Sequence, residues 1–590
     1  FYSLRIAEKK MVEKSKELKE KEQKILSNKT QSIYALALLI GFCIVINIIF
    51  SFVNFKIDLT EEKRFTLTPS TVQMLNGLKD NIYVEVLLEG QFPAGFKRLQ
   101  ESTKDLLDQF RSESPYIQYR FFDPLALVTV AEKNNRIKDL AEDGIKPTNL
   151  RVMEENESTE KIIYPVAVVK FGSKSIPVNL LENSIAGFSD EEVLNQSINL
   201  LEYKIADAIN KILRVQKPTI AITKGHGESK PIETQDLINT LSPFYNLKWI
   251  SLDSMYTVPD DIKLIIMPNP SVKFDEKAKF VLDQFVMKGG DVMFLINRLK
   301  IDMDSLRNVR AEYVPIENDV NLEDMFFKYG VRIQPNLILD LECSKIPLVV
   351  GKLGTGAQTE LFKWYYAPLL SSNSINPIVK NIDRVNAYWT STVDTIKTKT
   401  DIKKTVLLSS SQYSRVQFAP VRINFEILRY DPDPSKFNKP NQPVAVLLEG
   451  KFPSLYENRV SPDMLKTLTD IKAEYKSSGD EAKILVVSYG KLINNLYNPT
   501  QSDYMPMGYN TFEKQLYGNK DFVINAIEYM FDEKGILAAR AKEVKLRLLD
   551  TVKIKNERSF WQFINVLLPI SLLGLGALFF NILRKRKFAS

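Results

Sequence analysis

Residues 219–228, TIAITKGHGE, join a short β-branched run to a glycine turn, and this segment decides the fold expected for the middle of the chain. Thr219 to Thr223 is a strand candidate because β-branched residues are enriched in strands. Strand and helix candidates then alternate: strands at 247–252, 264–267 and 291–297, helices at 234–241 and 274–287. This alternation is typical of a doubly wound parallel sheet, so we predict a Rossmann-like domain over residues 217–445.

The turn Gly225-His226-Gly227-Glu228 follows the first strand of this domain. Open parallel sheets bind ligands at the carboxyl ends of their strands, so we name these four residues as candidate ligand-binding residues. His226 is the chain's single histidine and could form an acid/base pair with Glu228. The competing interpretation, which we favour, is a tight turn whose imidazole packs or hydrogen-bonds locally.

Other catalytic patterns are missing from the sequence. There is no second histidine or nearby cysteine for a zinc site, and no G-x-S-x-G elbow. Residues 351–356, GKLGTG, lack the order of a phosphate-binding loop, so we predict an ordinary loop there. We therefore predict no catalytic residue, no metal and no cofactor, and a protein that is not an enzyme.

An α/β domain also precedes the Rossmann-like domain. Its expected elements are strands at 81–89 and 116–122, a helix at 96–112, a hairpin at 161–180 around Gly172 and a long helix at 190–215. A strand, helix, strand unit with so long a crossover implies parallel pairing.

Downstream of the Rossmann-like strands the alternating pattern of strands and helices loosens from about 300 to 480. It then returns in a strand at 484–487 and helices at 521–531 and 537–550. Residues 86–93 and 446–453 match at seven of eight positions, which suggests similar strand-to-turn positions.

Two uncharged apolar stretches, 33–55 and 561–582, lie near the ends of the chain. Each exceeds the roughly 20 residues that a membrane-spanning helix needs. For the first stretch, its length and the lack of an A-x-A site argue against a cleaved signal peptide, and 23 residues without a charge argue against a buried core helix. The residues suited to helix packing in lipid are Asn47, Asn54, Asn565, Ser571 and Gly574. No charged residue lies in either stretch, so neither resembles an ion pathway.

Charge gives the expected orientation. Residues 1–31 carry nine Lys or Arg against five Glu, a net +4, and the tail after the second stretch adds another +4. The whole chain is +7, so everything between is near −1. Basic residues beside a span stay on the cytoplasmic side, so both termini are expected in the cytoplasm and the central region across the membrane. A near-neutral centre argues against a nucleic-acid partner, and anionic membrane lipid suits the tails.

The expected fold is therefore α/β, with two transmembrane helices flanking a multi-domain region that lies outside the cytoplasm. The expected segments are a cytoplasmic amphipathic tail (1–31), a first transmembrane helix (32–55), an α/β domain (56–216), the Rossmann-like domain (217–445), a closing α/β region with a juxtamembrane helix (446–559), a second transmembrane helix (560–582) and a basic cytoplasmic tail (583–590).

Three stretches together suggest a family: the connector DLTEEKRFTLTPST at 58–71, the GHGE turn, and the run at 517–550 that leads into the last apolar stretch. They resemble the GldG family, the gliding-motility-associated, so-called substrate-binding auxiliary components of ABC-type transporters. The resemblance covers nearly the whole chain and is weakest from about 300 to 440. It implies an inner-membrane protein with a periplasmic domain, and makes 217–445 an ABC-transporter auxiliary domain of Rossmann-like or amidotransferase-like shape. An amidotransferase nucleophile is not evident, because Cys343 has no flanking glycines.

The resemblance also implies partners: a multispan GldF-like permease and a cytoplasmic GldA-like ATPase. The predicted function is a non-catalytic auxiliary subunit whose periplasmic domain binds a partner or cargo and couples to ATP-driven motion of the complex. Two alternatives stay open. One is an envelope-glycan or peptide hydrolase using His226 and Glu228, and the other is a tethered module that recognises envelope polysaccharide.

Overall fold

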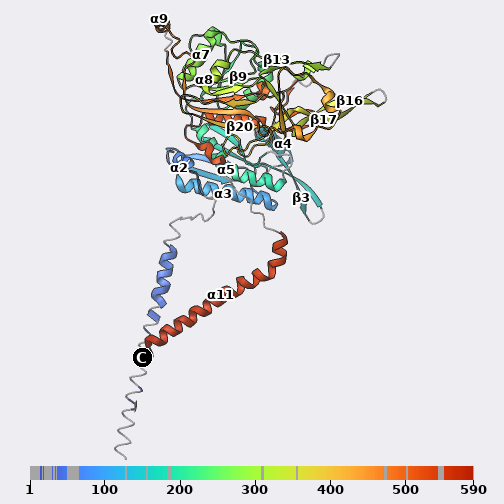
Figure 1. Ribbon diagram of the computed structural model, residues 1–590. Helices are drawn as coiled ribbons and strands as arrows, with labels where there is room; N and C mark the ends of the chain where they lie inside the picture. The colour runs from blue at the N-terminus through green and yellow to red at the C-terminus, as the bar shows by residue number, and fades with distance from the viewer. Residues whose placement is uncertain are drawn as a thin grey trace, which may run out of the picture. The chain divides into compact units, whose positions relative to one another are not determined.

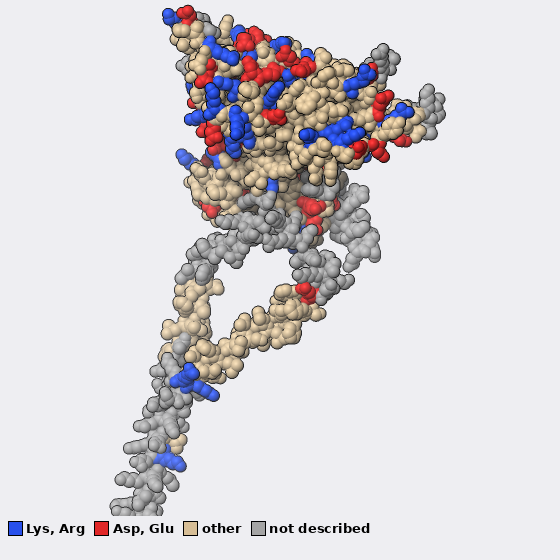
Figure 2. Space-filling view, viewed as in Figure 1, with Lys and Arg blue, Asp and Glu red and all other residues tan. Residues whose placement is uncertain are grey.

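The computed structural model describes residues 66–541, apart from gaps at 127–128, 155–156, 183–188, 307–310, 354–355, 471–474 and 500–502, together with 551–588 and, upstream, 14–15, 18, 30, 33–34 and 36–48. The chain divides into two compact units, Phe1–Lys542 and Glu543–Ser590. We call the described part of residues 66–541 the α/β body. Figure 2 shows Lys and Arg interspersed with Asp and Glu over the visible face of the body.

The first sheet of the body has the strand order β2-β1-β5-β6. β1 (Ile82–Val86) pairs in parallel with β2 (Ile117–Phe121) across the helix α3 (Ala94–Glu113), which confirms the predicted crossover. β5 (Val166–Phe171) and β6 (Lys174–Asn179) form the predicted hairpin around Gly172. The long helix α5 (Asp190–Ile212) packs against this sheet and against α3 (Figure 1).

Local sequence explains where α5 begins. Ser189 accepts a hydrogen bond from the backbone N–H of Glu192, whose carboxylate accepts one in return from the backbone of Ser189. This capping box satisfies two donors that an open helix end would leave without partners. The acidic first turn, residues 190–192, also suits the positive end of the helix dipole.

The second sheet has seven strands in the order β20-β23-β24-β10-β9-β7-β8. Five of them are mutually parallel: β7 (Thr219–Thr223), β8 (Asn246–Ile250), β9 (Ile262–Pro268), β10 (Asp291–Leu295) and β24 (Ser478–Val487). Along the chain this is the 2-1-3-4-5 order of a doubly wound sheet, which confirms the predicted α/β architecture. β20 (Ile402–Ser409) and β23 (Pro443–Pro453) extend one edge as antiparallel strands.

Both faces of the second sheet are covered. Every residue of β7 is buried, and alternate residues face two different cores: Ala221 packs with residues of α7 (Glu276–Met287), Ile220 with residues of α6 (Gln235–Leu241) and α10 (Asn519–Met530). Side chains of a strand point to opposite faces in turn, so a strand covered on both sides is apolar throughout. The predicted boundary at 445/446 falls inside β23, and residues on both sides of it belong to this sheet.

A β-rich segment occupies the region where the sequence pattern loosens. β16 (Cys343–Leu353) and β17 (Gly356–Leu370) form a long hairpin, and β15 (Asn336–Asp340) pairs with β21 (Ser414–Phe418). The segment has its own core around Trp364, Tyr366 and Trp389. The loop predicted at 351–356 is wrong in its described part, because residues 351–353 end β16 and Gly356 begins β17.

The remaining described elements are short. They are α2 (Pro69–Asn76), α4 (Val130–Glu142), β3 (Thr148–Glu154), β4 (Glu157–Ile163), β11 (Leu299–Lys300), β12 (Glu312–Tyr313), β13 (Ile316–Glu317), α8 (Glu323–Tyr329), β14 (Val331–Ile333), β18 (Val385–Asn386), β19 (Val393–Thr395), β22 (Ile423–Asn424), α9 (Pro462–Asp470), β25 (Tyr497–Asn498), β26 (Asp503–Tyr504), β27 (Tyr509–Asn510) and β28 (Gln515–Leu516). The two similar octapeptides share one feature, a left-handed glycine with φ +136° at Gly90 and +141° at Gly450, but β1 ends at Val86 whereas β23 continues to Pro453. The helix predicted at 537–550 begins as a 3-10 helix, Ile536–Ala541, and its remainder lies outside the described residues.

The described residues of the second unit form one helix, α11 (Thr551–Phe588). Its stretch Glu557–Arg586 is the one helix among the described residues that is long and apolar enough to cross a membrane. In the first predicted span the described helix, Leu36–Ile48, is too short to cross by itself, since about 20 residues are needed. The rest of that span, from residue 49, lies outside the described residues, so the structure supports one spanning helix where the sequence predicted two.

Candidate functional site

The loop after β7 lies where the strand order of the second sheet reverses, because β7 is flanked by β8 on one side and β9 on the other. Two backbone N–H groups of the loop after β9, from Ser271 and Val272, donate to the carbonyl oxygen of His226 at 2.8 and 2.9 Å. In return, the N–H of Ser229 donates to the carbonyl of Pro268 at 2.9 Å. The two loops therefore close the crevice at which such sheets often hold a ligand.

Glycine makes this approach possible. Gly227 has φ +72°, and a Cβ on it would lie 2.2 Å from Oγ of Ser271. Gly225 has φ +113°, and a Cβ on it would lie 2.9 Å from Oγ of Ser251. Both positions need a left-handed backbone and a missing side chain, which only glycine supplies without strain.

The imidazole of His226 is 2% exposed and lies within the chain's own polar groups. Its Nε2 lies 3.0 Å from Oδ1 of Asp253, and its Nδ1 lies 3.8 Å from Oε1 of the buried Glu228. The ring stacks on Phe274 with 3.8 Å between ring centres. Glu228 also accepts a hydrogen bond of 2.6 Å from the backbone N–H of His226. The structure thus brings the four predicted residues together as one packed turn.

The ionisable groups of this turn, the His226 ring and the carboxylates of Glu228 and Asp253, change one another's pKa values. Burial alone lowers the pKa of His226, but the carboxylates of Glu228 and Asp253 outweigh it, so the pKa is raised. Burial raises the pKa of Glu228, but hydrogen bonds from His226 and the turn's backbone outweigh it, so that pKa is lowered. The raised pKa favours the protonated form of the imidazole, and its two ring nitrogens face carboxylates of this chain.

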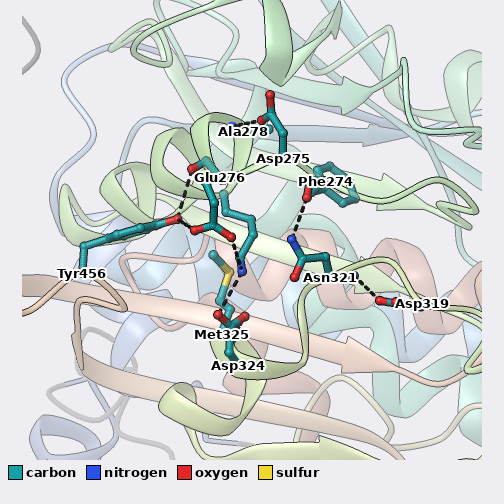
Figure 3. Close-up of polar contacts among 10 residues, drawn as sticks. Phe274, Asp275, Glu276, Ala278, Asp319, Asn321, Asp324, Met325 and Tyr456 are labelled. Atoms are coloured by element: carbon teal, nitrogen blue, oxygen red, sulfur yellow. Dashed lines mark hydrogen bonds and ion pairs between the residues drawn. The ribbon is translucent and has the colours of Figure 1, made fainter. Parts of the chain in front are cut away.

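The stacking partner, Phe274, is itself held by a polar network at the start of α7 (Figure 3). Asn321 donates to the carbonyl of Phe274 at 2.9 Å, and the next residue, Asp275, caps α7 by accepting from the N–H of Ala278 at 2.7 Å. One turn on, the ammonium group of the buried Lys279 lies 3.1 Å from Glu276 and 2.9 Å from Asp324.

The hydroxyl of Tyr456, from the loop after β23, completes this network by donating to the carboxylate of Glu276 at 3.0 Å. A buried ammonium group is tolerated only where it is paired, as Lys279 is here. Phe274, and with it the His226 ring, therefore has a fixed position. Among the described residues no group of three or more His, Cys, Asp or Glu could hold a metal ion.

A second feature of the same sheet edge was not predicted: a cleft of about 410 Å³ beside the residues that follow β10 and β24, within the usual size of small-molecule sites. We call it the amide–aromatic cleft. Its asparagines are Asn297, Asn386, Asn494, Asn495, Asn510 and Asn519. Its aromatic residues are Tyr388, Trp389, Tyr489, Tyr509 and Phe512. Asn494 accepts a hydrogen bond of 2.9 Å from the hydroxyl of Ser229, which links the cleft to the His226 loop.

Sequence reasoning missed this cleft because its residues span more than 200 positions and share no spacing. The one local signal is the group Asn494-Asn495 shortly after the predicted strand at 484–487. A polar pair at the carboxyl end of a parallel strand can indicate a ligand site, but the sequence of the strand does not show which other loops face that pair.

The residues predicted to pack membrane helices lie on two separate helices where the structure describes them. Asn47, Asn565 and Ser571 are exposed on their helices, and a Cβ at Gly574 would meet nothing within 4 Å. The hydroxyl of Ser571 donates to the carbonyl of Leu567, one turn earlier, at 2.7 Å. Asn54 lies outside the described residues. Their role in helix packing stays a prediction.

Comparison with known proteins gives matches to two families. The family described as an ABC-type uncharacterized transport system, an auxiliary (ABC_transp_aux) family, matches residues 217–526, just over half of the chain. A domain family of unknown function matches residues 61–170. One relative, an uncharacterized protein of Borreliella burgdorferi, is 23% identical over 466 residues, which cover 77% of this chain and 82% of that protein.

Solved structures offer only weak likenesses. The mmIFT52 N-terminal domain covers 53% of this chain and 97% of its own at 12% identity and a TM-score of 0.29. The exo-β-1,4-mannosidase Op5Man5 from Opitutaceae bacterium strain TAV5 covers 78% of this chain and 51% of its own at 10% identity and a TM-score of 0.19. TM-scores this low do not establish a shared fold.

Proposed function

Because this chain belongs to the ABC-type uncharacterized transport system family, as an auxiliary component, we propose that it is a non-catalytic subunit anchored in the inner membrane. In this proposal α11 docks on a multispan permease, GldF-like in kind, and a GldA-like cytoplasmic ATPase powers the complex. The α/β body lies in the periplasm, where it binds a partner or cargo and moves with the permease. The resemblance to the GldG family supports a role of this complex in gliding motility.

The observation that carries the proposal is the helix Glu557–Arg586, whose apolar stretch is not buried against any of the described residues. Its apolar side chains, such as Leu573 at 75% exposure, need lipid or another apolar helix as their surroundings. Residues 559–583 of this helix carry no charged side chain. Figure 2 shows this uncharged stretch with acidic side chains at one end and basic side chains at the other. An uncharged helix suits anchoring and docking better than ion conduction.

The geometry favours a structural role over hydrolysis at the His226 turn. A general acid or base must reach the proton that it transfers. The His226 ring is 2% exposed, stacked on Phe274, and has a carboxylate of this chain near each nitrogen. The hydrolase alternative predicts that His226→Gln with Glu228→Gln abolishes transport or motility even when the protein folds and reaches the membrane. Our proposal predicts that both persist.

The decisive experiment is co-purification from the native membrane. We expect the affinity-tagged full chain to bring down a multispan permease and an ATPase in fixed ratio. The control replaces Glu557–Arg586 by an unrelated apolar helix of equal length, which keeps the anchor and removes the specific surface. Recovery of neither partner with the native helix, or of both with the replacement, would refute the proposal.

A further inference from the structure

The amide–aromatic cleft is distinctive in its chemistry. Of its twenty lining residues, six are asparagines and five are aromatic, whereas three are charged. One of the charged groups, the ammonium of Lys491, lies 3.9 Å from the carboxylate of Asp302, so part of this charge is paired within the chain. A site for phosphate or another anion needs concentrated positive charge, which this lining does not provide.

Amides and aromatic rings together match one kind of ligand. A sugar ring has hydroxyl groups around its edge and C–H groups on its faces. Primary amides both donate and accept hydrogen bonds, and so suit hydroxyl groups. Aromatic faces are large, rigid and apolar, and Tyr adds a polar hydroxyl. Four aliphatic side chains among twenty are too few for an acyl-chain site.

The walls of the cleft are fixed without a ligand. The side chain of Asn519 accepts from the backbone N–H of Asn386 at 2.9 Å and donates to its carbonyl at 2.8 Å. Asn495 accepts from the N–H of Asp236 at 3.0 Å and donates to the carbonyl of Ile232 at 3.1 Å. A cleft whose walls are already ordered loses less entropy when a ligand binds.

The backbone at one wall adds a second observation. Trp389 has φ +59°, a left-handed conformation that is unusual for a bulky residue. Its N–H donates to the carbonyl of Tyr366 at 2.9 Å, and its ring packs against Trp364. The surrounding β-rich core therefore imposes this conformation, and strained positions of this kind cluster at ligand sites.

We propose that the amide–aromatic cleft binds a neutral saccharide, held by stacking on its aromatic residues and by hydrogen bonds from its amides and tyrosine hydroxyls. The cleft belongs to the α/β body alone. Saccharide binding can therefore be measured on the purified chain, whether or not the permease and ATPase assemble with it.

The test uses the full chain in a detergent without a sugar head group. It is applied to an array of neutral oligosaccharides of glucose, galactose, mannose and N-acetylglucosamine, and the strongest binder is then titrated by calorimetry. Phe512 is 46% exposed, so Phe512→Ala removes a cleft ring at little risk to folding. Phe418→Ala is the matched control, because Phe418 is 61% exposed and outside the cleft.

We expect a neutral oligosaccharide to bind, Phe512→Ala to weaken binding about three- to tenfold, and Phe418→Ala to leave it unchanged within error. Tyr489→Phe, which keeps the ring and removes only the hydroxyl, should also weaken binding. Binding of no array member, binding only of anionic glycans or peptides, or equal losses in both phenylalanine variants would overturn the proposal. Co-purification with the permease would be unaffected by any of these results.

Discussion

At the scale of single residues, the turn after β7 depends on glycine at position 227. Gly227 has φ +72° and contacts the loop after β9, whereas Gly144 has φ +78° and open space around its Cα. Alanine at either position strains the backbone, but only at 227 does its Cβ also collide with Oγ of Ser271. We expect Gly227→Ala to cost about 2–3 kcal/mol in free energy of unfolding and Gly144→Ala about 1 kcal/mol. Urea unfolding of both variants measures the difference, and equal losses would contradict it.

The protonation of His226 gives a pH-dependent prediction. Its pKa is raised in the folded chain, chiefly by Glu228 and Asp253 acting against burial. The extra stability is therefore fully present below the unfolded value of about 6.5 and is lost as pH rises through the folded pKa. We expect His226→Gln to lower the free energy of unfolding by about 1–3 kcal/mol at pH 5.5 and by less at pH 9.

A second variant separates this cause from a general loss of packing. Glu228→Gln removes one carboxylate that faces the ring and should flatten the same pH dependence while His226 stays in place. Denaturant unfolding at the two pH values, on the full chain in detergent, provides the measurement. A constant difference between wild type and His226→Gln across this range would show that the imidazole is not charged in the folded protein.

The residue scale also shows what sequence can and cannot predict. The His226 turn could be located because its signal is local: two glycines shortly after a five-residue strand in which four residues are β-branched. Its role as a closed turn depends on Asp253 and Phe274, which come from other loops and have no spacing that identifies them. The amide–aromatic cleft could not be predicted at all, because residues as distant as Asn297 and Asn519 meet only in the fold.

At the scale of elements, helices α5 and α10 are joined by buried charges. Nζ of Lys211 on α5 lies 2.6 Å from Asp207 and also contacts Glu528 on α10, with its side chain 8% exposed. Glu528 in turn accepts a hydrogen bond from the hydroxyl of Tyr203. Burial lowers the pKa of Lys211, but these two carboxylates outweigh it and raise the pKa, so the ammonium group is charged.

Removal of one partner should therefore be costly. We expect Lys211→Met to lower the free energy of unfolding by about 3–5 kcal/mol, because it leaves two buried carboxylates without their cation. Lys97→Met is the matched control, since Lys97 pairs with Glu101 in the exposed i, i+4 geometry and should cost less than about 1 kcal/mol.

A double variant tests the coupling itself. Lys211→Met combined with Glu528→Gln should recover part of the loss, and a double-mutant cycle on thermal or urea unfolding measures that interaction. Strictly additive losses would show that the two helices are not coupled through these charges.

For single elements, the bounds of a strand could be predicted from the sequence, but its pairing partners could not. The strand predicted at 219–223 has the observed bounds of β7, because a parallel strand covered on both faces is a continuous apolar run with a clear end. The antiparallel edge was not predicted. β20 and β23 join β24 across long connections, and no periodicity within a strand indicates which neighbour it pairs with.

At the scale of the whole molecule, an α/β body with a ligand-sized cleft is linked in sequence to an apolar helix that needs lipid. The ABC-type transport system family matches the middle of the chain, residues 217–526. A helix apolar enough to cross a membrane is a suitable anchor for an auxiliary component of such a system. Charge alone does not decide the orientation, because residues 542–558, which precede the apolar stretch 561–582 in sequence, hold six Lys and Arg of their own. The proposed orientation therefore depends chiefly on the basic tail at 1–31, together with the prediction that both apolar stretches cross the membrane.

Cysteine labelling tests this orientation directly. Tyr430 is 74% exposed on the body, and the two native cysteines are Cys343, which is buried, and Cys43, inside the first apolar stretch. We expect a membrane-impermeant maleimide to label Tyr430→Cys in intact spheroplasts, and Ser590→Cys in the basic tail only after the membrane is opened. The reason is that a body held outside by two spanning helices faces the medium, while a basic tail stays with the cytoplasm. Labelling of both positions in intact spheroplasts would mean that α11, which lies between them in sequence, does not cross the membrane. Labelling of the tail alone would place the body, and any saccharide that it binds, in the cytoplasm.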